Sequence, residues 1–269
     1  MRRFSPEYLE DTRRGLWGDR SALEPLALST RDRVLDVGCG TGELTRVLRE
    51  ESPGTVVGID ADRRLLAHVD PPTLQGDATR LPVRDRVADL VACQALLVNL
   101  PDPVATVREF RRVSSDLVAV IEPDNAGVAV DSTVAAEATL AADLREAYIT
   151  GVDTDVTIGA RLPEVLDSAG LEVLTTATHY HHQTVEPPYT DRDRESARQK
   201  AAATQLDAAK PALLAGDLTE SGFDALRRDW QSMGRTVIDQ MDTERYRRAE
   251  VVPFHVAVGR VPAEADPNT

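Results

Sequence analysis

Glycines at alternate positions follow an apolar, strand-like segment near the start of the chain. Residues 33–37 (RVLDV) are apolar except at Arg33 and Asp36, and glycines stand at positions 38, 40 and 42. Residues 42–51 then carry apolar side chains at helical spacing. A strand, a glycine turn and a helix in this order are typical of α/β sheets, in which such a turn faces a ligand.

The alternation of strands and helices continues far beyond this turn. Helices are predicted over residues 5–18, 61–69, 103–113, 133–149 and 158–170, and two more over 191–248, broken around Pro211 and Gly216. Ser221 and Asp224 are predicted to cap the second of these. Further strands are predicted at residues 55–60, within 72–78, and at 88–94, 117–124, 171–180 and 254–260. Because the strands are continuously apolar, the pattern indicates an α/β fold with a parallel sheet covered on both faces.

Charge and composition exclude some classes of protein. The net charge of −14 disfavours nucleic acid as a partner, because acids are interleaved with the few basic clusters. No apolar run approaches the roughly 20 residues that span a bilayer, and the N-terminus lacks the apolar core of a secretory signal. Cys39 and Cys93 are the only cysteines and form no disulfide framework. We therefore expect a cytoplasmic protein.

The basic residues have an unusual composition. Lys200 and Lys210 are the only lysines among 31 basic residues, so arginine supplies the other 29. Many acids, almost no lysine and few aromatic residues resemble the proteins of salt-loving archaea, whose carboxylate surfaces stay soluble in concentrated salt. A GC-rich genome is the alternative explanation, since it also favours arginine over lysine.

The glycine turn matches neither of the common phosphate-binding motifs. A strand that ends at glycines and begins a helix leaves backbone N–H groups near a positive dipole end. A dinucleotide site expects G-x-G-x-x-G/A, whereas this chain has G-x-G-x-G with Glu43 at the sixth position. A P-loop requires a lysine, and none is nearby.

Acids lie at or near the ends of the first three predicted strands. Asp60, at the end of the second strand, can accept hydrogen bonds from both hydroxyls of a ribose. Asp77, after the third, is placed to bind an adenine amino group. Asp36 lies inside the first strand, where a buried carboxylate requires a partner such as turn N–H groups or a ligand ammonium. Together these acids favour a cationic, adenosine-bearing ligand over a pyrophosphate.

Six segments in order resemble the class I S-adenosylmethionine-dependent methyltransferases of the small-molecule type. The segments are VLDVGCGTG, VVGID, GDATRLP, ADLVACQALLVNLPDP, IEPD and IGARLPEVLDSAGL, within residues 31–180. The resemblance implies a Rossmann-like, mostly parallel sheet of seven strands whose last strand is antiparallel. It also implies S-adenosylmethionine as the cofactor and a small-molecule methyl acceptor.

The same resemblance implies where the cofactor lies. The turn from Gly38 through Cys39 to Gly40 would border its methionine part, with Asp36 nearby. The remaining contacts would come from Asp60 and Ala61 at the ribose, Asp77 and Ala78 at the adenine, and the backbone of Cys93 or Gln94 at the amino-acid end. The first helix, with Tyr8, Arg14 and Trp17, is expected to fold over the cofactor.

Two residues are candidates for a general base. Glu122 follows the fifth strand, and a solvated loop acid is the alternative interpretation. His179 belongs to a histidine run at 179–182, for which an exposed surface cluster is the favoured interpretation. Alternation along a strand places His179 and His181 on one face, but no cysteine or acid completes a metal site, and no metal is assigned. Cys93 is expected to be an inert strand thiol, and residues 186–189 (EPPY) a loop exit.

The predicted organisation is a single methyltransferase domain, residues 1–269. It comprises an N-terminal helix (1–20), a cofactor-binding core (31–180), a helical insertion that could be a substrate lid (183–250) and a flexible tail (261–269). Residues 1–20, 124–157 and 183–250 are expected to select an acceptor that is not strongly acidic. Two alternatives stay open: a non-catalytic S-adenosylmethionine-binding partner or sensor, and an NAD-dependent oxidoreductase, which Glu43 and the acids disfavour. Nothing in the sequence indicates the oligomeric state.

Overall fold

The computed structural model describes residues 4–263, so the prediction of a flexible tail at 261–269 falls mostly outside the described residues. The chain forms two compact units. Unit 1 comprises Met1–Pro123, Thr157–His179 and Phe254–Thr269, and unit 2 comprises Asp124–Val156 and Tyr180–Pro253. Each unit is described by itself below.

The sheet of unit 1 confirms the predicted fold class. Its strands are β1 Arg33–Val37, β2 Thr55–Asp60, β3 Thr73–Gln75, β4 Ala88–Gln94 and β5 Ser114–Pro123, with parts of β7 Glu172–Val185 and β8 Arg248–Arg260. The order is β3-β2-β1-β4-β5-β8, and β7 pairs with β8. Strands β1 to β5 pair in parallel, whereas β8 is antiparallel to β5, as expected for the last strand.

The described residues contain eight strands rather than seven. The additional strand, β6 Ala129–Ser132, pairs antiparallel with residues 248–251 of β8 in unit 2. Its four residues are at most half-buried and lack an apolar run, so no strand was predicted there. Strands β7 and β8 are also longer than predicted, because each continues from one unit into the other.

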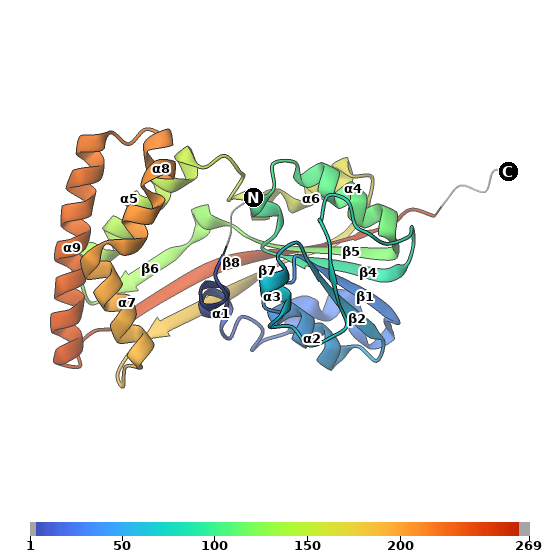
Figure 1. Ribbon diagram of the computed structural model, residues 1–269, viewed down its shortest axis with the longest axis horizontal. Coiled ribbons are helices and arrows are strands. Elements are labelled where there is room, and N and C mark those ends of the chain that lie inside the picture. The colour runs from blue at the N-terminus through green and yellow to red at the C-terminus, as the bar shows by residue number, and fades with distance from the viewer. Residues whose placement is uncertain (1–3, 264–269) are drawn as a thin grey trace, which may run out of the picture. The chain divides into compact units, whose positions relative to one another are not determined.

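Helices cover both faces of the unit 1 sheet. They are α1 Pro6–Arg13, α2 Glu43–Glu51, α3 Arg63–Leu66, α4 Pro103–Val113 and α6 Leu162–Ser168. Figure 1 shows α4 and α6 on one face and α2 on the other. Helices α4 and α6 pack on the sheet in one apolar core, which includes Val107 and Phe110 of α4, Leu162 of α6, and Val91 and Val120 of the sheet. The parallel pairing of β1 with β2 and β4 places the carboxyl ends of these three strands along one edge.

Two helices begin where they were predicted to begin, and a capping residue precedes each. The Ser5 hydroxyl accepts a hydrogen bond from Tyr8 N (3.2 Å), with Pro6 at the first helical position of α1. The Asp102 carboxylate accepts one from Ala105 N (2.9 Å), with Pro103 opening α4. Helix α1 ends at Arg13, however, and not at Gly18 as expected.

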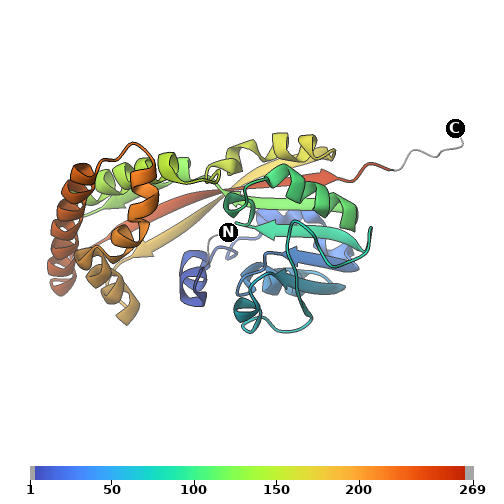
Figure 2. The ribbon, with the colours of Figure 1, turned by 45° about the horizontal axis from the view of Figure 1, so that its top comes forward.

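Unit 2 is built mainly from helices, which Figure 2 shows grouped together. They are α5 Ala135–Gly151, α7 Asp191–Ala202, α8 Thr204–Ala215 and α9 Glu220–Asp242. Side chains from all four form one apolar core, including Leu140, Leu206, Phe223 and Trp230. The apolar positions of the predicted insertion are therefore mostly core residues of this unit.

The prediction of two helices over residues 191–248 was wrong in their number, although the predicted break at Gly216 is confirmed, because α8 ends at Ala215 and α9 begins at Glu220. The chain breaks at Ala203, which has a left-handed φ of 59°, and forms three helices in that fully described range. Pro211 lies inside α8 rather than at a break. Thr219, not Ser221 or Asp224, caps α9 by accepting a hydrogen bond from Gly222 N (3.1 Å). An alanine in the left-handed region carries no sequence signal, because glycine or asparagine is the usual residue there.

A buried acid connects the segments of unit 2. Glu137 of α5 accepts hydrogen bonds from Ser132 Oγ (2.6 Å) and Tyr246 Oη (2.9 Å), and it forms an ion pair with Lys200 of α7. Burial opposes ionisation, but Lys200, Ser132 and Arg248 hold the pKa of Glu137 below its ordinary value. Removing any one of these partners would leave a buried charge uncompensated, so the contacts fix the arrangement of β6, α5 and α7.

Across residues 4–263, none of the helices has the length and apolar character needed to cross a bilayer.

Candidate functional site

A cavity of about 730 Å³ lies at the carboxyl ends of β1, β2 and β4 in unit 1. The N-terminal segment closes one side of it, and the turns after the strands form the rest. Its lining residues are Phe4, Leu9, Arg13, Gly38, Gly40, Asp60, Ala61, Asp62, Arg63, Arg64, Leu65, Gln75, Gly76, Ala78, Ala95, Leu96 and Asn99. Several residues predicted to bind a cofactor are thus brought together in one place.

The first N–H groups of the glycine turn are not available to a ligand. Gly38 N and Cys39 N donate to the Ile59 carbonyl at 2.7 and 3.0 Å, and Gly40 N donates to Asp60 Oδ2 at 2.9 Å. The expectation that this turn presents N–H groups to a ligand was therefore wrong for these three positions. A phosphate would have to compete with the acceptors that β2 already supplies.

Two positions of the turn require glycine. Gly38 has φ of 71°, and a Cβ there would lie 2.7 Å from Leu96 Cδ1. Gly40 has φ of 56°, and a Cβ there would lie 3.0 Å from Leu9 Cδ1. The backbone therefore comes close both to the turn after β4 and to α1.

Asp60 is held in a fixed orientation at the end of β2. Its Oδ2 accepts the hydrogen bond from Gly40 N, and its Oδ1 accepts one from Asp62 N at 2.8 Å. A carboxylate has about four lone-pair positions, so each oxygen can still accept a hydroxyl donor. The residue lines the cavity, as predicted for a ribose-binding acid.

Asp36 is a buried acid with one oxygen satisfied. Thr45 Oγ1 of α2 donates to Asp36 Oδ2 at 2.5 Å. No hydrogen-bond partner for Asp36 Oδ1 exists among the described residues. Burial raises the pKa of Asp36 to about 6, against the opposing effects of Thr45 and Arg13. A cationic donor at Oδ1 would remove the cost of this buried oxygen.

Gln94 of β4 has a related arrangement. Trp17 Nε1 donates to Gln94 Oε1 at 2.7 Å. Within residues 4–263, the buried Nε2 atom of the same amide has no hydrogen-bond partner. Asp36 pairs with Ala92 in the sheet, so Gln94, two residues further along β4, lies on the same face as Asp36.

Arg13 is a functional candidate that the sequence did not reveal. It lines the cavity from the end of α1. Burial lowers the pKa of its guanidinium, whereas the nearby charges of Glu122, Asp36 and Asp60 raise it. The residue named instead, Arg14, is largely exposed and lies 3.7 Å from Asp11. Leu9 is buried, and helical spacing from Leu9 to Arg13 was the signal that could have identified the right arginine.

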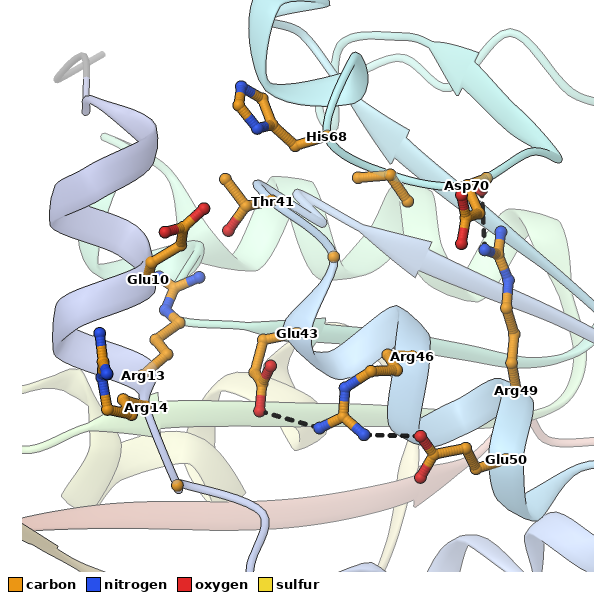
Figure 3. A pocket seen from close by; sticks show the side chains of 13 residues that line it. Glu10, Arg13, Arg14, Thr41, Glu43, Arg46, Arg49, Glu50, His68 and Asp70 are labelled. Carbon is orange, nitrogen blue, oxygen red and sulfur yellow. Dashed lines mark hydrogen bonds and ion pairs between the residues drawn. The ribbon is translucent and has the colours of Figure 1, made fainter.

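A second cavity, of about 610 Å³, lies between α1, α2 and the segment 68–70 (Figure 3). Its charged side chains largely neutralise one another. Arg46 bonds to Glu43 and Glu50, and Arg49 donates to the Asp70 carbonyl at 2.7 Å (Figure 3). We assign it no ligand.

The remaining predicted cofactor residues have different surroundings. Ala78 is buried and lines the first cavity, whereas Asp77 is exposed and its Oδ1 accepts from Thr79 N and Oγ1 at 2.9 and 2.8 Å. Cys39 packs beside Gly58, and Cys93 lies 3.8 Å from Glu122 Oε1. Burial raises the pKa of both thiols, which disfavours the reactive thiolate.

Glu122 is fully buried, so the interpretation as a solvated loop acid was wrong. Its Oε1 accepts hydrogen bonds from the backbone N–H groups of Leu96 and Leu97 at 2.9 and 2.8 Å. Its Oε2 accepts one from Val98 N at 3.3 Å. Burial raises the pKa of Glu122 to about 7, although these N–H groups oppose the shift. The residue thereby holds the turn after β4 that lines the cavity; its action as a base stays a prediction.

His179 is also buried, so the exposed-cluster interpretation was wrong for it and for His181. Its Nε2 lies 2.7 Å from the Leu16 carbonyl. Its ring stacks on Trp17 with a centroid distance of 5.4 Å and an interplanar angle of 26°. His179 therefore anchors the segment after α1 to β7. The described residues hold no cluster of three or more histidine, cysteine or acidic side chains suited to a metal ion.

Part of the chain is similar to known proteins. Residues 35–116 match the family described as a methyltransferase domain. The matched range contains most of β1, all of β2 to β4, the glycine turn, Asp60 and Gln94.

Two curated relatives match a similar share of the chain. Demethylmenaquinone methyltransferase of Lactiplantibacillus plantarum is 32% identical over 107 residues, which cover 35% of this chain and 45% of that protein. An uncharacterised methyltransferase of Schizosaccharomyces pombe is 34% identical over 100 residues, covering 31% and 36%. The chain thus spans less than half the length of these relatives.

The fold itself is shared more widely than the sequence. A crystal structure of a provisionally named methyltransferase from Bacillus halodurans C-125 matches with a TM-score of 0.51 at 14% identity. The match covers 90% of this chain and 99% of that one. At this level of identity the likeness establishes the fold alone.

The close contact at Gly38 leads to a test with an internal control. Gly15 has φ of 72° with no atom within 4 Å of an added Cβ among the described residues, whereas Gly38 has φ of 71° and the contact with Leu96. Gly15→Ala should cost about 1–2 kcal/mol of stability from backbone strain alone. Gly38→Ala should cost about 1–3 kcal/mol more, because Leu96 must move. Urea unfolding of both variants measures the difference; equal losses would show that Leu96 is not in contact with the turn.

Proposed function

We propose that this protein binds S-adenosylmethionine and transfers its methyl group to a small-molecule acceptor. The observation that carries the proposal is the combination of turn N–H groups bound to β2 with a buried acid, Asp36, whose Oδ1 lacks a partner among the described residues. This combination suits a cation and not a phosphate.

The residues present fit the parts of such a cofactor. Asp60 would accept from the ribose hydroxyls, and Asp36 Oδ1 from the α-ammonium group. The adenine would lie among Gly76, Ala78, Leu96 and Asn99, which line the cavity. The cofactor, when bound, supplies an electrophilic methyl group on a positively charged sulfur.

The chain's contribution to the reaction is mainly positioning. The turn after β4, held by Glu122, and the glycine turn, held by Ile59 and Asp60, form walls whose backbone cannot shift independently. Orientation of two reactants in such a site can contribute roughly 7–11 kcal/mol to lowering a barrier.

The acceptor is proposed to be a small molecule that is not strongly acidic, given the net charge of −14. Curated relatives include demethylmenaquinone methyltransferases, but the similarity covers about a third of this chain. We propose that residues 1–20, 124–157 and 183–250 select the acceptor within one methyltransferase domain, the last as a lid. Unit 2 comprises much of these segments.

One observation favours a non-catalytic binder as the second candidate. Glu122 and His179, the two proposed bases, both have hydrogen bonds to backbone groups. Either the acceptor needs no base, as for a carbon nucleophile on a quinol-like ring, or the chain binds the cofactor without using it. Transfer of a labelled methyl group to a panel of acceptors distinguishes the two.

Calorimetric titration with S-adenosylhomocysteine tests the cofactor assignment, with NAD as the ligand control. Asp60→Ala should weaken binding about 10–100-fold, because a charged hydrogen-bonding group is lost. Asp85→Ala, which removes an exposed acid paired with Arg112, should leave the affinity unchanged. Binding of NAD in place of the sulfur compound would contradict the proposal.

The affinity should depend on pH through Asp36. An ammonium ligand binds the ionised carboxylate, so affinity should rise as the pH increases through about 6, the pKa of Asp36. Below pH 6 the affinity should fall by nearly tenfold for each pH unit. Asp36→Asn should bind weakly and without this slope between about pH 5 and 7. Glu122→Gln serves as a parallel variant, since Glu122 has a pKa of about 7 and also faces Arg13. If the pH dependence of the affinity disappears in Glu122→Gln but not in Asp36→Asn, the titrating group is Glu122 and not Asp36.

We further propose adaptation to concentrated salt, from the net charge of −14 and the near absence of lysine. Salt screens repulsion between surface carboxylates, so the thermal midpoint should rise by several degrees from dilute buffer to molar potassium chloride. A differential scanning calorimetry series measures this. Equal thermal midpoints in dilute buffer and in molar potassium chloride would favour the GC-rich genome as the explanation for the scarcity of lysine.

A further inference from the structure

The segment after α1 makes one hydrogen bond that settles the orientation of a buried amide. Trp17 is buried, and its Nε1 lies 2.7 Å from Gln94 Oε1. An indole N–H can only donate, so the atom that faces it must be the amide oxygen. The nitrogen of Gln94 is therefore turned away from Trp17, and chemistry alone determines this orientation.

The Gln94 side-chain nitrogen is a hydrogen-bond donor that requires an acceptor. Gln94 Nε2 is buried, and nothing in residues 4–263 accepts a hydrogen bond from it. A buried donor without a partner costs free energy, which a ligand acceptor would recover. Ala95 and Leu96, the next two residues, line the 730 Å³ cavity. Asp36 lies on the same face of the sheet, so a donor for a carboxylate and an acceptor for an ammonium lie on the same side of two neighbouring strands.

Trp17 is itself held in place by β7. His179 Nε2 lies 2.7 Å from the Leu16 carbonyl, and a carbonyl only accepts, so this nitrogen carries the proton. The His179 ring stacks on the indole at 5.4 Å. Two contacts, one polar and one aromatic, thus determine where the indole N–H points.

We propose that Trp17, held by His179, is a positioning residue that turns the Gln94 amide so that its nitrogen donates to the carboxylate of an amino-acid-bearing ligand. The inference rests on the proposed function, in which that ligand is the cofactor. It assigns roles to two residues that do not touch the reacting atoms. His179 acts as an anchor, and Trp17 acts through Gln94.

Two ligands separate this role from a merely structural one. S-adenosylhomocysteine carries the amino-acid end, and 5′-methylthioadenosine keeps the nucleoside and lacks that end. Trp17→Phe retains a ring against His179 and removes the N–H, so the Gln94 amide is free to rotate. Calorimetry should show about tenfold weaker binding of S-adenosylhomocysteine and unchanged binding of 5′-methylthioadenosine.

A double-mutant cycle tests whether Trp17 acts through Gln94. Gln94→Leu should weaken S-adenosylhomocysteine binding to a similar extent, and adding Trp17→Phe to it should produce no further loss. Trp230→Phe, at the only other tryptophan, should change neither affinity. Additive losses, or equal weakening of both ligands by Trp17→Phe, would overturn the proposal.

His179→Phe provides a second route if Trp17→Phe does not fold. It keeps the stacked ring and removes the hydrogen bond to Leu16, so the affinity for S-adenosylhomocysteine alone should fall. An unchanged affinity in a folded variant would overturn the anchoring role. Failure of the folded wild-type protein to bind either ligand would instead remove the proposed function, and the positioning role with it.

Discussion

The hydrogen bonds between the glycine turn and the end of β2 determine what this site can bind. Gly38 and Cys39 donate to the Ile59 carbonyl, and Gly40 donates to Asp60. Because of these bonds, the three N–H groups are not free to bind a phosphate, and the Asp60 carboxylate is held in one orientation. The backbone donors that would bind an anion in a dinucleotide fold serve here to orient an acid. The polarity of the site is thereby reversed, and a ligand with hydroxyl and ammonium donors fits it.

The buried charges around the turn form one group. Asp36 and Glu122 are both buried acids whose pKa burial raises, to about 6 and about 7. Arg13 lies close enough to both for its charge to favour their ionised forms. Since desolvation outweighs attraction and brings both pKa values close to neutral pH, small changes in the cavity would alter the protonation of these acids. A ligand that brings its own positive charge would shift this balance towards the carboxylates.

Much of the fold followed from local sequence patterns. The run at 33–37 predicted β1 correctly, and the helix predicted over 103–113 is α4. Such elements depend on neighbouring residues alone. The break at Ala203 did not follow, because packing of α7 and α8 on α9 forces an alanine into the left-handed region without a local signal.

The residues of the candidate site also fall into those that the sequence could predict and those that it could not. Asp60 and Gly38 could be placed from spacing, because strand ends meet at one edge of a parallel sheet. The burial of His179 could not, since it depends on Leu16 and Trp17, more than 160 residues earlier in the chain. Arg13 and Arg14 are adjacent in sequence, and only the packing of Leu9 decides which one faces the cavity.

The family match covers only part of the proposed site. Residues 35–116 include Asp36, Gly38, Asp60 and Gln94, which we propose hold the cofactor. Arg13, Trp17 and His179, which close and orient the site, all lie outside that range. The likeness to a solved structure at 14% identity shows that the fold can be kept with few identical residues. Under the proposed function, we therefore expect the acceptor to be selected by residues of this chain that its relatives do not match, beginning with the segment that carries Trp17.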